Sequence, residues 1–175
     1  MDNQQATLTD MELGWLGGVV DSDGCISMSR SDRGNYILYG CDIVFTNTDP
    51  VFIEEVARLL NKGGIGCHVR WSKQSGLGKK TVGEVRVGGH KRCFTALSVL
   101  TPGIRAKREQ ASYMLEFLKR RLAVDRPGPH EYTMEDHMCW AMLKAFKDRG
   151  ASETIRETAD VVADDIVQAS VKTLD

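Results

Sequence analysis

The sequence predicts an α+β fold with the element order α-β-β-α-β-β-α, in which the strands form two antiparallel pairs. Two pairs of segments alternate apolar and polar residues around a loop, which is typical of antiparallel strands with one buried face. Segments with helical periodicity flank each pair. A chain of 175 residues is long enough for one domain with a sizeable core, followed by a helical extension.

The first helix begins with a capping box, in which Thr9 is the N-cap and Glu12 is its partner three residues later. We expect this helix to run from Asp10 to Val20 or Asp21. The expected strands are Cys25–Ser31, Tyr36–Asn47, Ile65–Lys73 and Thr81–Gly89. The further expected helices are Asp49–Gly63, His90–Leu100, Ile104–Val124, Tyr132–Gly150 and Ser152–Leu174. Residues 1–124 would form the core domain, and residues 125–175 a C-terminal helical extension.

Charge is distributed unevenly along the chain, although the formal net charge is only −1. Residues 1–124 contain 17 Lys and Arg against 13 Asp and Glu, whereas residues 125–175 contain 6 against 11. Residues 66–92 contain seven basic residues and a single acid, Glu84. Because phosphate contacts are local, this segment indicates a nucleic-acid surface despite the acidic total. Solvated lysines on an ordinary hairpin are the alternative.

The first helix carries an unusual stripe of small residues. At 100° per residue, Gly14, Gly17, Gly18 and Asp21 fall on one side of it. Each interior glycine costs roughly 0.8–1 kcal/mol relative to alanine. Close packing against another backbone would offset that cost, either across an interface with a second copy or against a helix of the same chain.

Asp21 and Asp23 follow at the end of this helix, where the helix dipole disfavours negative charge. A counter-charge is therefore needed, and hard carboxylate oxygens suit Mg²⁺. An alternative is a turn in which Asp23 bonds to backbone N–H groups before Gly24.

The segment "LGGVVDSDG", residues 16–24, resembles the nine-residue signature of the LAGLIDADG homing endonucleases. The resemblance implies a saddle-shaped fold, with helices on one side and a four-stranded antiparallel sheet on the other that lies in the DNA major groove. A chain with a single signature is implied to act as a homodimer on double-stranded DNA, cutting a long pseudo-palindromic site with Mg²⁺. The dimer interface would include Gly14, Gly17, Gly18 and Asp21.

The resemblance also implies site residues. Asp23 matches the catalytic, metal-binding acid, and the backbone carbonyl of Ser22 is a second metal ligand. Asn47 is the candidate for positioning the attacking water. Lys107 is the candidate for stabilising negative charge near the active site, with Arg105 and Arg108 as alternatives.

Strand alternation selects the DNA-facing residues. With Tyr39, Ile43, Val69, Val85 and Val87 buried, the opposite face would contact bases. The expected base contacts are Ser27, Ser29, Asp42, Val44, His68, Arg70, Ser72 and Arg86. The expected phosphate contacts are Arg30, Arg33, Lys73, Lys79 and Lys80.

Two other interpretations remain open. The fold could serve a non-cutting binder, such as a maturase acting on intron RNA or a DNA-binding regulator. It could instead be a protein-interaction module whose D-x-D-G is a turn. The five cysteines lack a C-x-x-C pair and the first residues are polar, so we expect an intracellular protein with reduced thiols and no membrane segment.

Overall fold

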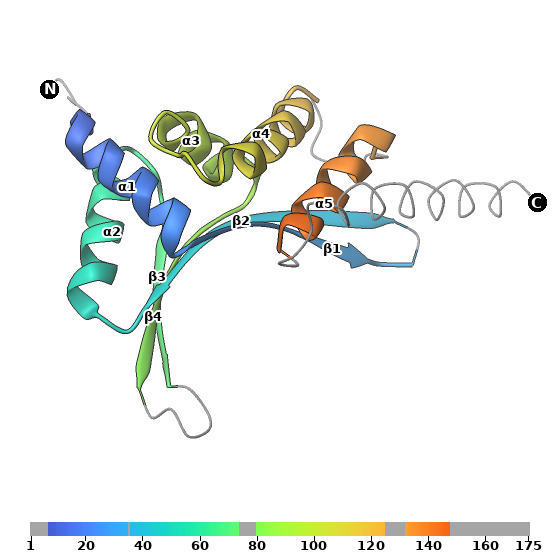
Figure 1. Ribbon diagram of the computed structural model, residues 1–175. Helices are drawn as coiled ribbons and strands as arrows, with labels where there is room; N and C mark the ends of the chain where they lie inside the picture. The colour runs from blue at the N-terminus through green and yellow to red at the C-terminus, as the bar shows by residue number, and fades with distance from the viewer. Residues whose placement is uncertain (1–6, 35, 74–79, 125–131, 148–175) are drawn as a thin grey trace, which may run out of the picture.

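The computed structural model in Figure 1 describes residues 7–34, 36–73, 80–124 and 132–147. The helices are α1 (Asp10–Ser22), α2 (Pro50–Lys62), α3 (His90–Leu100), α4 (Arg108–Leu122) and α5 (Met134–Lys147). The strands are β1 (Gly24–Asp32), β2 (Ile37–Asn47), β3 (His68–Lys73) and β4 (Thr81–Gly88). The expected last helix, at residues 152–174, and Lys79 lie outside the described residues.

Local signals set the helix starts much as expected. Thr9 caps α1, because its hydroxyl accepts from the Glu12 backbone N–H while the Glu12 carboxylate accepts from the Thr9 N–H. Asp49 caps α2 by accepting from the Val51 N–H at 2.9 Å, with Pro50 in the first turn.

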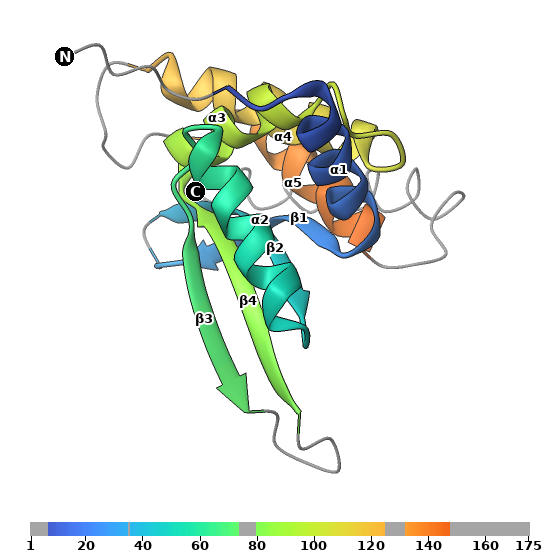
Figure 2. The ribbon, with the colours of Figure 1, turned by 90° about the vertical axis from the view of Figure 1, so that its left-hand side faces the viewer.

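The sheet is antiparallel with strand order β1-β2-β4-β3. Figures 1 and 2 show the helices gathered on one side of this curved sheet, which leaves its other face without a helix in the described part of the chain. The alternation in β2 is as expected, since Tyr39, Cys41, Ile43 and Phe45 are buried between more exposed neighbours.

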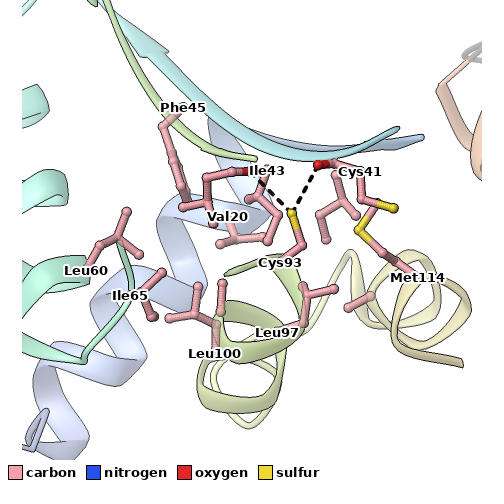
Figure 3. Close-up of a cluster of buried hydrophobic side chains, with 14 of the residues drawn as sticks. Val20, Cys41, Ile43, Phe45, Leu60, Ile65, Cys93, Leu97, Leu100 and Met114 are labelled. Atoms are coloured by element: carbon pink, nitrogen blue, oxygen red, sulfur yellow. Dashed lines mark hydrogen bonds between the residues drawn. The ribbon is translucent and has the colours of Figure 1, made fainter. Parts of the chain in front are cut away.

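The core lies between the helices and the covered face of the sheet (Figure 3). Cys93 of α3 sits within it, and its thiol is shared between the carbonyls of Cys41 and Val87 at 3.2 and 3.3 Å. Burial raises the pKa of the Cys93 thiol to about 12, so it stays protonated. All five cysteines of the sequence are free thiols.

Helix α5 lies beyond the expected domain boundary at residue 124, yet it shares this core. Cys139 and Leu143 belong to the buried apolar cluster, and the helix packs against α4 and β1. The buried Asp136 accepts from Arg120 Nε at 2.9 Å, which ties α5 to α4. No helix within the described segments is long and apolar enough to cross a membrane.

Candidate active site and nucleic-acid interface

Helix α1 delivers Asp23 to the surface. Asp23 is the C-cap residue, and its backbone N–H donates to the Val19 carbonyl at 3.0 Å. Its side chain is exposed, and within the described segments its carboxylate takes part in no hydrogen bond or ion pair. The Ser22 hydroxyl donates to the Gly18 carbonyl at 3.0 Å, so the side chain of Ser22 folds back onto the helix. The exposed carboxylate of Asp23 is thus available for an external partner.

Asp21, the first acid of the signature, is used inside the chain. Its carboxylate accepts from the backbone N–H groups of Arg105 and Lys107 at 2.7 and 2.9 Å. Burial raises the pKa of Asp21, but the backbone N–H groups of Lys107, Arg105 and Ala106 lower it more, so the pKa falls below its ordinary value. Asp21 therefore joins the end of α1 to the segment that precedes α4.

The side chain of Lys107, in the segment before α4, contacts the backbone at the end of α1. Its ammonium donates to the carbonyls of Val20 and Gly24, at 2.9 and 2.6 Å, which lie on either side of Asp23. These carbonyls include the negative end of α1, so the Lys107 charge offsets the helix dipole there. Helix α4 begins only at Arg108, later than the expected Ile104, because the residues before it are bound to Asp21.

Asn47 lies at the same end of the β1–β2 ladder. Gly24 pairs with Phe45, which brings the last residue of β2 beside the turn that carries Asp23. The Asn47 side-chain oxygen accepts from the Asp49 N–H at 3.0 Å, so its amide nitrogen is the group left to face outward. The structure thus brings Asp23, Lys107 and Asn47 to one end of α1.

The glycine stripe of α1 divides into two sides. Gly14 and Gly18 have no neighbouring atom within 4 Å of an added Cβ, so this side is open. A Cβ on Gly17 would lie 2.2 Å from the Gly103 carbonyl oxygen. The expectation that Gly17 lies in an interface with a second copy was wrong, because Gly17 packs closely against Gly103 of its own chain. The open side forms a depression of about 400 Å³ lined by Asp10, Leu13, Gly14, Gly18, Asp21, Pro102, Gly103 and Arg105.

Comparison with known proteins agrees with this geometry. Residues 10–93 match the family model described as a LAGLIDADG-like domain. The expected resemblance to the LAGLIDADG homing endonucleases is confirmed, as is the α+β fold with its four-stranded antiparallel sheet.

A curated relative of this chain is the DNA endonuclease I-CvuI of Chlorella vulgaris, 31% identical over 115 residues. The match covers 63% of this chain and 65% of that relative. The crystal structure of I-CvuI in complex with the I-CreI target superposes with a TM-score of 0.62 at 22% identity, covering 87% of this chain and 94% of that one. The crystal structure of I-GzeII in complex with its DNA target superposes with a TM-score of 0.58 at 12% identity. That superposition covers 83% of this chain and 47% of the I-GzeII chain. These two structures show the fold.

The uncovered face of the sheet carries most of the residues expected to contact bases. Cross-strand pairs place residues in rows across the strands: Ser27–Asp42–Gly88, Cys25–Val44–Arg86–His68 and Thr46–Glu84–Arg70. Ser29 and Ser72 lie on the same face by alternation. Cys25 and Thr46, exposed beside the acidic end of α1, were missed, although the alternation of their strands already indicated them.

Two expected phosphate contacts face the other way. Arg30 pairs with the buried Tyr39, and its guanidinium lies 5.3 Å from the ring centroid of Trp140 in α5. Expecting Arg30 at the nucleic-acid face was therefore wrong, because α5 covers this end of β1. Lys73 shares its face with Val69 and Trp71, on the side of the sheet where the helices pack. Arg33 and Lys80 are exposed in or beside loops, where they can reach a phosphate.

Strand β3 differs from its expected burial. All six of its residues are exposed, and Val69, expected in the core, is 46% exposed. β3 is the edge strand of the sheet. It extends past the helices in Figure 1, so apolar burial on one face is not required of it.

Proposed function

We propose that this chain is a sequence-specific double-stranded DNA endonuclease of the homing type. It would cut a long pseudo-palindromic site as a homodimer by divalent-metal-dependent phosphodiester hydrolysis. The observation that carries the proposal is the exposed, unengaged carboxylate of Asp23, next to Lys107 and at the edge of an open sheet face. The relative I-CvuI, named a DNA endonuclease, supports the same activity.

The residues at this end of α1 fit a divalent cation in part. The Asp23 carboxylate and the Ser22 backbone carbonyl are hard oxygen ligands, which Mg²⁺ prefers. Within the described residues, no group of three or more His, Cys, Asp or Glu side chains could hold a metal. One copy therefore offers the Asp23 carboxylate and the Ser22 carbonyl, and a second copy would add its own Asp23, with waters completing the shell of the cation. A bound divalent cation would lower the pKa of a water and offset charge on the phosphate.

The dimer would form on the open side of α1. Gly14 and Gly18 leave room there for another backbone, and the depression beside them is continuous with the acidic end of the helix. A two-fold axis through this side would set the two Asp23 residues close together. Each copy would then place its open sheet face on one half of the target.

The chain's own residues would take the following roles in hydrolysis. Asp23 holds the cation, and the Asn47 amide orients the attacking water. Lys107 supplies positive charge near the scissile phosphate and keeps the Asp23 turn in place. Water attack on phosphorus breaks the bond to the 3′ oxygen, which leaves with a proton as a 3′ hydroxyl and yields a 5′ phosphate.

The test is a cleavage assay on DNA targets selected from a duplex library with Mg²⁺. Asp23→Asn should abolish cutting while leaving the affinity for the selected DNA largely intact, because no hydrogen bond or ion pair of the described residues uses that carboxylate. EDTA should stop cutting by the unaltered protein. Glu54→Gln, an equal charge change on the exposed side of α2, is the control and should cut normally. Full cleavage by Asp23→Asn would refute this role.

A second candidate is a non-cutting nucleic-acid binder that keeps the fold, such as a maturase for intron RNA or a DNA-binding regulator. The observation that favours it is the engagement of the Lys107 ammonium by two backbone carbonyls. Tight binding of a selected DNA or of a structured intron RNA, without cleavage of any duplex in Mg²⁺, would support this candidate over the first.

A further inference from the structure

Arg86 lies in the middle of the open sheet face, between two carboxylates. Its Nε donates to Glu84 Oε1 at 3.1 Å, and its Nη1 lies 3.7 Å from Asp42 Oδ2. The Arg86 side chain remains 48% exposed. In the cross-strand rows, Arg86 stands between Val44 of β2 and His68 of β3. The guanidinium is thus oriented by the protein before any ligand arrives.

Gly88 makes room for this arrangement. It pairs directly with Asp42, and a Cβ on Gly88 would lie 2.7 Å from Asp42 Oδ1. The Asp42 carboxylate therefore occupies the space that a side chain at position 88 would take, and lies beside Arg86. Asp42 is one of the expected base contacts, but in the structure its carboxylate lies 3.7 Å from the guanidinium of Arg86 in its own chain.

Two carboxylates on a surface that meets DNA oppose the phosphates and lower non-specific affinity. Their pairing with Arg86 offsets the guanidinium charge, and this weakens the attraction of Arg86 for a phosphate. Among the described contacts, Nη2 has none and Nη1 approaches Asp42 only to 3.7 Å, so one N–H of each of these two nitrogens can form a planar fork. Such a fork matches the O6 and N7 acceptors of guanine in the major groove.

Building on the proposed endonuclease function, we infer that Arg86 contacts a guanine base in each half of the target and that Asp42 is a positioning residue for it. Asp42 would act through the orientation of Arg86 and would touch no base itself. Glu84 holds Nε from the other side. Arg86, Asp42 and Glu84 together would set the base preference at one position of each half-site.

The experiment uses the full-length protein and a randomised duplex DNA library, followed by duplexes in which each position of the selected site is varied. The unaltered protein should prefer guanine at one position of each half-site by on the order of tenfold or more. Arg86→Lys keeps the charge but loses the fork, and should lose this preference. Asp42→Asn should reduce the preference at that position alone and should bind unrelated DNA more tightly.

Gly88→Ala tests positioning without changing any charge. The added Cβ would lie 2.7 Å from Oδ1 at the flexible end of Asp42, whereas the Arg86 Cγ and Cδ atoms, at 4.0 Å, are in ordinary contact distance, so the fold tolerates it while the carboxylate moves. Its guanine preference should fall several-fold at the same position. Glu54→Gln should change neither preference nor non-specific affinity.

The outcomes separate this inference from the function it rests on. If the unaltered protein selects no sequence, the proposed function fails and the inference fails with it. If it selects a site but Asp42→Asn and Gly88→Ala keep the same preference, the inference alone is overturned. A loss of preference spread equally over all positions would also overturn it, because that is the signature of a general structural defect.

Discussion

Gly17 and Gly18 are adjacent in the signature helix but have different surroundings. Gly17 lies against the Gly103 carbonyl, whereas Gly18 faces open space. A helical wheel places both on one stripe, because they are only 100° apart. The sequence could indicate that the stripe is packed closely, but not against what. That depends on where the loop between α3 and α4 passes, which the wheel does not contain.

We expect opposite effects from alanine at these two positions. Gly17→Ala should lower the free energy of unfolding by about 1–3 kcal/mol or more, since its Cβ would overlap a backbone carbonyl. Gly18→Ala should raise the free energy of unfolding of the monomer by roughly 0.8–1 kcal/mol, the difference in helix propensity. Urea unfolding at low protein concentration measures both. Equal effects would contradict the assignment of the two sides.

The same Gly18→Ala variant tests the proposed dimer. A methyl group on the open side of α1 would separate two helices that meet there. Sedimentation velocity should show a shift toward monomer in Gly18→Ala, although the fold itself is stabilised. An unchanged dimer, or a monomeric unaltered protein at micromolar concentration, would place the interface elsewhere or exclude it.

At the scale of elements, α5 is held on the sheet by polar contacts that the sequence did not reveal. His137 Nδ1 is hydrogen-bonded to the Tyr39 hydroxyl, and the Tyr132 hydroxyl accepts from the Tyr39 backbone N–H. The amphipathic pattern predicted this helix, but not that it covers β1. That placement decides the role of Arg30, which stacks on Trp140 rather than facing nucleic acid.

His137 should make stability depend on pH. Burial lowers its pKa, the Arg30 charge lowers it further, and Asp136 raises it only in part. Because the pKa in the folded state lies below the unfolded value of about 6.5, the unfolded state binds protons first as pH falls. Stability should therefore be complete above pH 6.5 and decrease below it. Thermal unfolding between pH 7.5 and 5 should show this slope, and His137→Gln should flatten it; an identical slope would exclude His137 as the cause.

The strands show where alternation predicts structure and where it does not. In β2 and β4 the alternating residues are buried as expected, because helices pack on one face of these two central strands. In β3 the same pattern predicted that Val69 is buried, and this was wrong, because Val69 is exposed. Alternation indicates which residues share a face, but whether a helix covers that face depends on the length and position of elements distant in sequence.

For the molecule as a whole, the fold sorts its positive charges into those that can reach DNA and those that cannot. Lys80 is exposed beside the β3–β4 loop, whereas Arg30 packs against α5. Lys80→Ala should reduce the slope of log affinity against log salt by about 0.9, the value for one lost phosphate contact. Arg30→Ala should leave the slope unchanged. Fluorescence titrations with duplex DNA at several salt concentrations measure both, and equal slopes in the two variants would contradict this sorting.

The exposure of the edge strand β3 has a consequence for how the DNA sequence recognised by such a protein could change in evolution. All six side chains of β3 are exposed, so replacing them escapes the penalties that follow from altering a packed interior. Three of them, His68, Arg70 and Ser72, lie on the uncovered face of the sheet that is proposed to meet DNA. Under the proposed function, substitutions in β3 could therefore change the recognised DNA sequence with little loss of stability, while the end of α1 that carries Asp23 stays constrained by its contacts with the segment before α4.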